Sequence, residues 1–217
     1  MMTESATGII LRSQPLTETS LIIHWLTPNF GRIATVAKGA RRPKSLFLGK
    51  LDLFYEADFL FNRSRHSDLH VLREVSLRET NSAIRENIVK VRQAAYGAAF
   101  IAQTTEAETP LPQIFELYGS FLESLAAREP SSQLVFAFEL KMLRELGLEP
   151  DWHNTSLTAG TAKATQALAE KDIKAGFGLK LADSQTSELR QFLHGFLVFH
   201  AGKVPRGRAQ ALSSEYV

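Results

Sequence analysis

Apolar and polar positions alternate in short runs through the first third of the chain. The clearest run is residues 51–61, in which every odd-numbered residue is apolar and several even-numbered positions carry a carboxylate. Such period-two alternation is typical of a half-buried β-strand. Five short strands without a helical pattern between them predict a small closed β-barrel. The predicted strands are residues 8–13, 20–27, 32–38, 51–61 and 69–75.

The hydrophobic periodicity changes near residue 81, after which apolar residues recur every three or four positions. This spacing predicts helices that each bury one stripe of side chains. The predicted helices are residues 84–102, 109–127, 133–146 and 188–200. Their predicted core stripes are Ile84, Ile88, Val91, Ala95, Ala98 and Ala102; Phe115, Tyr118, Leu122 and Leu125; Val135, Phe138, Met142 and Leu146; and Leu189, Phe192, Phe196 and His200.

Residues 152–187 show neither pattern and are rich in Thr, Ala, Gly and Lys. We expect an irregular insertion here, with one helix around residues 161–169. The predicted fold class is α+β with two domains. A five-stranded barrel forms residues 1–80, and a mainly α-helical domain forms residues 81–217.

Positive charge gathers after the third predicted strand. Between residues 19 and 51 the chain has six cations and no Asp or Glu, and four of these cations lie within residues 38–44. A concentrated positive field attracts a polyanion, whereas an ordinary solvated surface mixes both signs. A plain solvated basic loop is the alternative. The candidate polyanion-binding residues, including a smaller cluster near the end of the sequence, are Arg32, Lys38, Arg41, Arg42, Lys44, Lys50, Lys203, Arg206 and Arg208.

Catalytic and metal-binding patterns are weak in this chain. It has no Cys, which excludes disulfides, thiolate nucleophiles and Cys-ligated metals. Residues 39–45 end in Lys-Ser, but Pro43 replaces the glycine that a phosphate-binding loop requires. His66 and His70 are expected to be a surface pair. Glu56 and Asp58 share a strand face without a nucleophile or base beside them. We therefore expect no enzyme activity, no cofactor and no metal.

The start of the sequence lacks the basic and apolar regions of a signal peptide. No uncharged apolar run reaches the ~18 residues needed to span a bilayer. These observations lead us to expect a cytoplasmic protein without a membrane partner.

Several short motifs resemble a known family in order and spacing. The run Ala-Lys-Gly-Ala-Arg at residues 37–41 is the most specific of them, and the resemblance is to the N-terminal domain of the bacterial RecO family of recombination mediators. Many relatives have Arg at the position of Leu46, and many carry a four-Cys zinc module after the position of Pro150. The matching segments are residues 8–12, 17–20, 27–31, 36–41, 45–47, 49, 51, 138–140, 146–150 and 202–208.

The resemblance implies an N-terminal OB-fold and a helical C-terminal domain. It implies binding of single- and double-stranded DNA, annealing of complementary strands, and assistance in placing RecA on DNA coated by single-strand binding protein. It implies RecR as a partner and a place in the bacterial cytoplasm with the nucleoid. The acidic, apolar C-terminal peptide of single-strand binding protein is then expected to dock on the helical domain, with Lys141 and Arg144 as candidate contacts.

Two alternatives remain open from the sequence. An OB-fold module that binds RNA or single-stranded DNA without mediator activity fits the same charges, because phosphate contacts carry little sequence information. An enzyme is disfavoured by the missing catalytic site. Phe30 and Phe47 could either stack on bases or belong to the barrel core.

Overall fold

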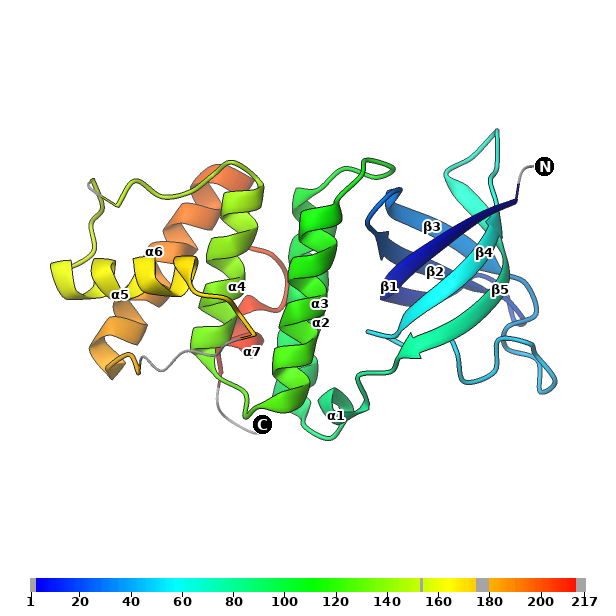
Figure 1. Cartoon of the computed structure of the whole chain (residues 1–217), viewed down its shortest axis with the longest axis horizontal. Coiled ribbons are helices and arrows are strands. Elements are labelled where there is room, and N and C mark those ends of the chain that lie inside the picture. Colours follow the sequence, from blue (N-terminus) through cyan, green and yellow to red (C-terminus); the bar gives the residue numbers. More distant parts are fainter. Residues whose placement is uncertain (1–2, 153, 175–179, 214–217) are drawn as a thin grey trace. The chain divides into compact units, whose positions relative to one another are not determined.

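The structure, a computed structural model, describes residues 3–152, 154–174 and 180–213. It divides into two compact units (Figure 1). Unit 1 contains Met1–Ser82 and Thr105–Gly119, and unit 2 contains Ala83–Thr104 and Ser120–Val217.

Unit 1 is built around a closed barrel with the strand order β1-β2-β3-β5-β4. Neighbouring strands are antiparallel except β3 and β5, which pair in parallel. This five-stranded arrangement confirms the predicted OB-fold. The strands are β1 (Thr3–Pro15), β2 (Leu21–Thr27), β3 (Gly31–Ala37), β4 (Glu56–Asn62) and β5 (Leu69–Glu79).

Large aromatic side chains fill the barrel. Trp25 and Phe59 stack with ring centroids 4.1 Å apart, and Phe61 lies 5.7 Å from Phe59. The Trp25 indole is fully buried and donates its N–H to Thr35 Oγ1 at 2.8 Å. A buried Trp needs such an acceptor, so a hydroxyl on the neighbouring strand allows the largest side chain to lie in the core.

The strand expected over residues 51–61 is wrong in its first half, because β4 begins only at Glu56. Phe54 has a φ of 67° and is buried, and its N–H donates to Ile10 O at 2.9 Å. The N–H of Leu53 donates to the Asp52 carboxylate at 2.8 Å. Residues 51–55 therefore form a turn that leads into β4, although their odd-numbered positions are apolar as in a strand.

The segment Thr105–Gly119 packs on the barrel. Arg32 donates from Nε to Thr105 Oγ1 at 2.8 Å and from Nη2 to Thr105 O at 2.6 Å. Gly31 has a φ of 62°, and a Cβ there would lie 1.8 Å from Thr109 O. Only glycine allows the start of β3 to approach this segment so closely. Helix α3 (Pro112–Ala127) consequently begins in unit 1 and ends in unit 2.

Unit 2 is helical. All four helices predicted from the periodicity are present, although residues 86–87 divide the first of them into two helices. A further helix, α5 (Ala159–Glu170), occupies the position expected for a helix within the insertion. Helix α4 (Ser132–Glu145) is capped by the Ser131 hydroxyl, which accepts from Leu134 N at 3.3 Å, and it ends before Gly147 at a φ of 70°. Besides α3, the helices are α1 (Ser82–Arg85), α2 (Ile88–Thr104), α4 (Ser132–Glu145), α5 (Ala159–Glu170), α6 (Asp183–Ala201) and α7 (Arg208–Ala211).

Two of the predicted core stripes are wrong in phase. In α6 the buried residues are Leu189, Leu193 and Leu197, while the predicted Phe192 and Phe196 are half-buried and His200 is exposed. Of the stripe predicted for residues 84–102, Ile84 and Ala98 are buried, whereas Ile88, Val91, Ala95 and Ala102 are not. The other core residues of α2 include Val89, Tyr96, Phe100 and Ile101. Both helices carry apolar residues on adjacent stripes, so periodicity alone does not select the stripe that faces the core.

Helix α5 is held in unit 2 by contacts with α4 and α6. The Glu188 carboxylate on α6 accepts from Thr158 N at 2.5 Å, from Thr158 Oγ1 at 2.9 Å and from the Thr161 hydroxyl. At the other end of the helix, the Lys141 ammonium donates to Ala169 O at 3.0 Å. Hydrogen bonds thus anchor both ends of the helix in this Cys-free insertion.

Candidate nucleic-acid interface

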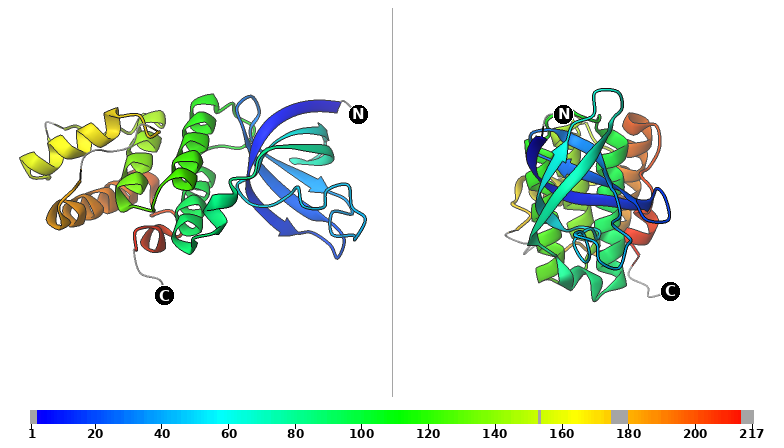
Figure 2. Two further views of the ribbon diagram at one scale, coloured as in Figure 1. Left: turned by 60° about the horizontal axis from the view of Figure 1, so that its bottom comes forward. Right: turned by 90° about the vertical axis from the view of Figure 1, so that its right-hand side faces the viewer.

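The loop between β3 and β4 carries the densest positive charge in the sequence. In Figure 2 this light-blue segment extends beyond the strands of the barrel. We call residues 38–50 the basic loop. Lys38, Arg41, Arg42 and Lys44 are all exposed, and none of the four has an ion-pair partner among the described residues. Residues 38–51 contain no carboxylate, so the charge of these four side chains is not neutralised locally.

Hydrogen bonds within the backbone order the basic loop. Arg42 N donates to Gly39 O at 3.1 Å, Ser45 N to Arg42 O at 3.1 Å, and Leu48 N to Ser45 O at 3.2 Å. The loop is also tied to the β1–β2 turn, because Arg41 donates from its backbone to Thr19 O at 3.0 Å and from Nη1 to Thr17 O at 3.2 Å. Successive turns therefore present the cations from an ordered backbone.

Two other candidate cations have structural partners instead. Arg32 is half-buried against Thr105, and burial lowers the pKa of its guanidinium. Lys50 donates from Nζ to Val75 O at 3.2 Å. The structure thus brings together four of the six candidate cations of this region and uses the other two within unit 1.

Both aromatic candidates for base stacking belong to the barrel. Phe47 is 8% exposed within the hydrophobic core. Phe30 packs edge-on against Phe61 with centroids 5.6 Å apart, and the Arg63 guanidinium lies 5.7 Å from the centre of its ring. The core interpretation is therefore confirmed for Phe47, and base stacking on its ring is wrong because the ring is covered. Phe30 is half-buried and packs against the same core.

The second basic cluster, near the end of the sequence, also contains both exposed cations and a cation with a structural partner. Lys203 and Arg206 are exposed, but Arg208 is 4% exposed and lies in unit 2 beside Glu139. Arg208 Nε donates to Glu139 Oε1 at 2.6 Å, and Nη2 donates to Oε2 at 2.9 Å. Its assignment to a DNA surface is wrong, because a guanidinium buried on a carboxylate has no face left for phosphate.

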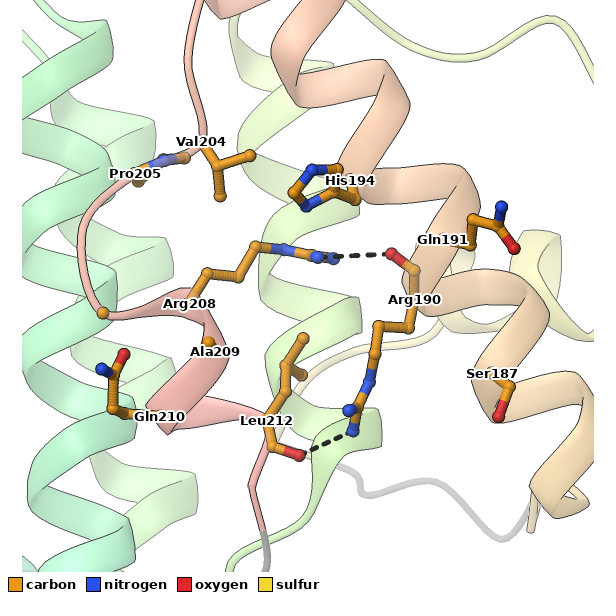
Figure 3. Close-up of a pocket in the computed structure, with 11 residues that line it drawn as sticks. Ser187, Arg190, Gln191, His194, Val204, Pro205, Arg208, Ala209, Gln210 and Leu212 are labelled. Atoms are coloured by element: carbon orange, nitrogen blue, oxygen red, sulfur yellow. Dashed lines mark hydrogen bonds between the residues drawn. The ribbon is translucent and has the colours of Figure 1, made fainter.

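Tyr96 completes this buried cluster. Its hydroxyl donates to Glu139 Oε1 at 2.5 Å, and burial together with the nearby carboxylate raises the pKa of the phenol well above its ordinary value. Arg208 also donates from Nη1 to Arg190 O at 3.2 Å, which joins α7 to α6 (Figure 3). Helices α2, α4 and α7 therefore meet at one buried carboxylate, and Arg208 extends the connection to α6.

The candidate partner-binding residues also have intramolecular contacts. Lys141 is half-buried, and burial lowers the pKa of its ammonium while it donates to Ala169 O. Arg144 pairs with Glu149 at 2.8 Å. Both remain at the surface of α4, but a peptide that bound there would compete with these contacts.

A cavity of about 570 Å³ lies elsewhere in unit 2, between α6 and residues 204–212 (Figure 3). The sequence analysis did not identify it, because its walls come from separate segments. Val204, Pro205 and Leu212 supply apolar surface, and Arg190 and His194 supply polar atoms at its edge. The Arg190 guanidinium donates to Leu212 O at 2.7 Å.

The residues considered as weak catalytic or metal-binding candidates have partners within unit 1. Arg78 lies 3.3 Å from Asp58 and 3.8 Å from Glu56. His70 is 1% exposed, so its expected place in a surface pair is wrong; it stacks on Phe61, and its Nε2 lies 3.5 Å from Glu108. Within the described residues no three His, Asp or Glu side chains gather as metal ligands.

Among the described residues, no helix combines the length and the apolar character that crossing a bilayer requires.

The sequence matches known families over both units. The profile of "Recombination protein O N terminal" matches residues 1–81, and that of "Recombination protein O C terminal" matches residues 85–159. Similar curated proteins named "DNA repair protein RecO" come from several bacteria. The protein of Listeria monocytogenes serotype 4b (strain CLIP80459) is 30% identical over 158 residues, which are 73% of this chain and 61% of the relative.

Two further relatives carry the same name. The protein of Bacillus subtilis (strain 168) is 31% identical over 66% of this chain and 56% of its own length. That of Alkaliphilus metalliredigens (strain QYMF) is 31% identical over 69% of this chain and 59% of its own length. The matched region is therefore about three fifths of the length of these relatives. With two family profiles in order and a closed five-stranded barrel at the first of them, the chain belongs to the RecO family.

Proposed function

We propose that this chain is a DNA repair and recombination mediator that binds single- and double-stranded DNA through the basic loop. It anneals complementary strands and, together with RecR, helps to place RecA on DNA coated by single-strand binding protein. Family membership supports the biological role. The observation that carries the DNA contact is the group of four exposed cations, without a local carboxylate, on an ordered loop of an OB barrel.

The geometry of the loop suits phosphates better than a single small anion. Arg41, Arg42 and Lys44 lie within four consecutive positions, and Lys38 stands three residues before Arg41. Exposed and unpaired cations neutralise phosphates by releasing condensed counterions, which contributes affinity without sequence preference. This matches a mediator that must act on strands of any sequence.

The helical unit is the proposed docking site for the acidic, apolar C-terminal peptide of single-strand binding protein. The notable feature for such a peptide is the cavity between α6 and residues 204–212, where apolar walls meet Arg190 and His194 (Figure 3). Lys141 and Arg144 are the second candidate position. Measuring the affinity of a labelled peptide for two variants, Arg190→Ala and Lys141→Ala/Arg144→Ala, distinguishes the two positions. Only the variant at the true docking position should bind the peptide more weakly.

An RNA- or single-strand-binding module without mediator activity is the alternative function. Direct competition between DNA and RNA of equal length and sequence distinguishes them. A mediator of DNA repair should bind the DNA at least as tightly as the RNA, and a clear preference for RNA would favour the alternative.

The decisive experiment is annealing of complementary strands coated by single-strand binding protein. The full chain should accelerate annealing, and the basic-loop triple variant Arg41→Ala/Arg42→Ala/Lys44→Ala should lose most of this acceleration. A surface triple control, Lys163→Ala/Lys171→Ala/Lys180→Ala, removes three exposed cations from unit 2 and should retain it. If the full chain binds DNA but never accelerates annealing or RecA loading, the mediator function is wrong.

A further inference from the structure

The basic loop carries two exposed leucines among its cations. Leu46 is 81% exposed and Leu48 is 66% exposed. Phe47 stands between them and points into the barrel core at 8% exposure. The buried Phe47 thus acts as an anchor that turns its two neighbours outward.

The backbone holds the leucines in this position. Phe47 N donates to Ser45 Oγ at 3.2 Å, Leu48 N to Ser45 O at 3.2 Å, and Lys50 N to Phe47 O at 3.1 Å. Lys50 then fastens the end of the loop to Val75 O. An ordered loop that keeps two large apolar side chains in water has a surface suited to an apolar partner.

Charge defines the chemistry of that partner. Arg41, Arg42 and Lys44 lie within the five residues before Leu46, and no carboxylate lies in the loop. A partner must therefore present anions and apolar surface at a short distance from each other. Single-stranded nucleic acid does so, because each phosphate is followed by a base whose face is no longer enclosed within a duplex.

The spacing of the leucines fits this partner. Side chains two residues apart are separated by at most about 7 Å of backbone. Stacked bases in a duplex repeat every ~3.4 Å along a strand, and unpaired bases can separate further. Two leucines can thus contact bases that are one or two steps apart. In duplex DNA the same bases are stacked, and leucine reaches them only by opening a step as an apolar wedge.

We propose that Leu46 and Leu48 contact the faces of unpaired bases while the neighbouring cations contact the phosphates. The loop then distinguishes single strands from duplex by apolar contact rather than by charge. This inference rests on the proposed function, since it needs DNA at the basic loop. It adds two specificity-determining residues that are not cationic.

The test compares Leu46→Ser/Leu48→Ser with the wild-type chain in DNA binding measured by fluorescence anisotropy at several salt concentrations. Affinity for single strands should fall about tenfold to a hundredfold, and affinity for duplex by less than about threefold, because burial of each leucine contributes only to the first. The salt dependence should keep its slope, because no phosphate contact is removed. A single strand that carries 2-aminopurine should change its fluorescence when the wild-type chain binds. This change should be lost when the double leucine variant binds instead.

Three controls make the result specific. Phe199→Ser removes a side chain that is 83% exposed in unit 2 and should leave DNA binding unchanged. Leu46→Met/Leu48→Met keeps the apolar surface and should restore single-strand affinity. Thermal unfolding should match the wild type in all three variants, because the substituted side chains are exposed.

The outcomes also separate this inference from the proposed function. If the wild-type chain does not bind DNA, the proposed function fails. If it binds, and the basic-loop triple variant weakens binding while the leucine variant retains single-strand affinity or loses duplex affinity equally, only the leucine inference is overturned. Binding of phosphatidylserine vesicles that depends on the leucines, with DNA affinity unaffected, would also overturn it in favour of a membrane surface.

Discussion

The buried pair of Glu139 and Arg208 makes the strongest stability prediction, and the perturbation is Arg208→Met. The substitution keeps the apolar stem, but the Glu139 carboxylate stays 0% exposed. Among the described residues, its remaining side-chain donor is the Tyr96 hydroxyl. Removing one partner of a buried ion pair destabilises a protein by about 3–5 kcal/mol. We expect a loss of this size for unit 2, a large part of the stability of an ordinary domain.

The assay is urea unfolding followed by circular dichroism at 222 nm, which reports mainly on the helices of unit 2. Arg206→Ala is the matched control, because this neighbour is exposed and its loss should change the free energy of unfolding by less than about 0.5 kcal/mol. The double variant Glu139→Gln/Arg208→Met removes both charges. It should be more stable than Arg208→Met alone, because no unpaired charge remains buried.

Two results would refute this reasoning. A loss below about 1 kcal/mol for Arg208→Met would show that the pair is hydrated and replaceable. A double variant that is as unstable as the sum of its single variants would show no coupling between the residues. Under conditions where Arg208→Met remains folded, its DNA affinity and salt dependence should equal those of the wild type, since a buried guanidinium makes no phosphate contact.

Three other predictions concern unit 1. The basic-loop triple variant should flatten the log–log salt dependence of single-strand binding by about two units, at about 0.7 per phosphate, while the surface triple control leaves the slope unchanged; an unchanged slope in both would remove the loop from the interface. Gly31→Ala should lower the melting temperature of the barrel, because the new Cβ would lie 1.8 Å from Thr109 O; a wild-type melting curve would contradict the close approach. Burial lowers the pKa of His70 below 6.5, so the unfolded state binds more protons and stability should fall as pH decreases from about 7 through the folded pKa. His70→Asn should weaken this pH dependence, and an identical pH profile would assign it to other groups.

Features that depend on neighbouring residues were predictable from the sequence. Period-two and period-3.6 patterns locate strands and helices because each side chain faces a direction set by its own backbone. The existence of five strands, the four main helices and the basic loop could therefore be predicted from the sequence. The exposure of Arg41, Arg42 and Lys44 follows similarly, because several charges of one sign within a few residues are difficult to bury.

Features that depend on distant residues were decided by the tertiary structure. The Pro-Arg-Gly-Arg context of Arg208 predicts an exposed cation. The structure instead buries Arg208 on Glu139, which lies 69 positions away in the sequence. The sequence allows Phe47 to be a base-stacking residue, but its ring is buried in the closed barrel. The apolar odd-numbered positions of residues 51–55 resemble a strand, but a hydrogen bond from Phe54 N to Ile10 O holds this segment in a turn. In α6, the contacts of unit 2 bury Leu193 instead of Phe192. Burial and pairing are properties of the packed molecule, so local pattern cannot determine them when two faces or two partners are chemically equivalent.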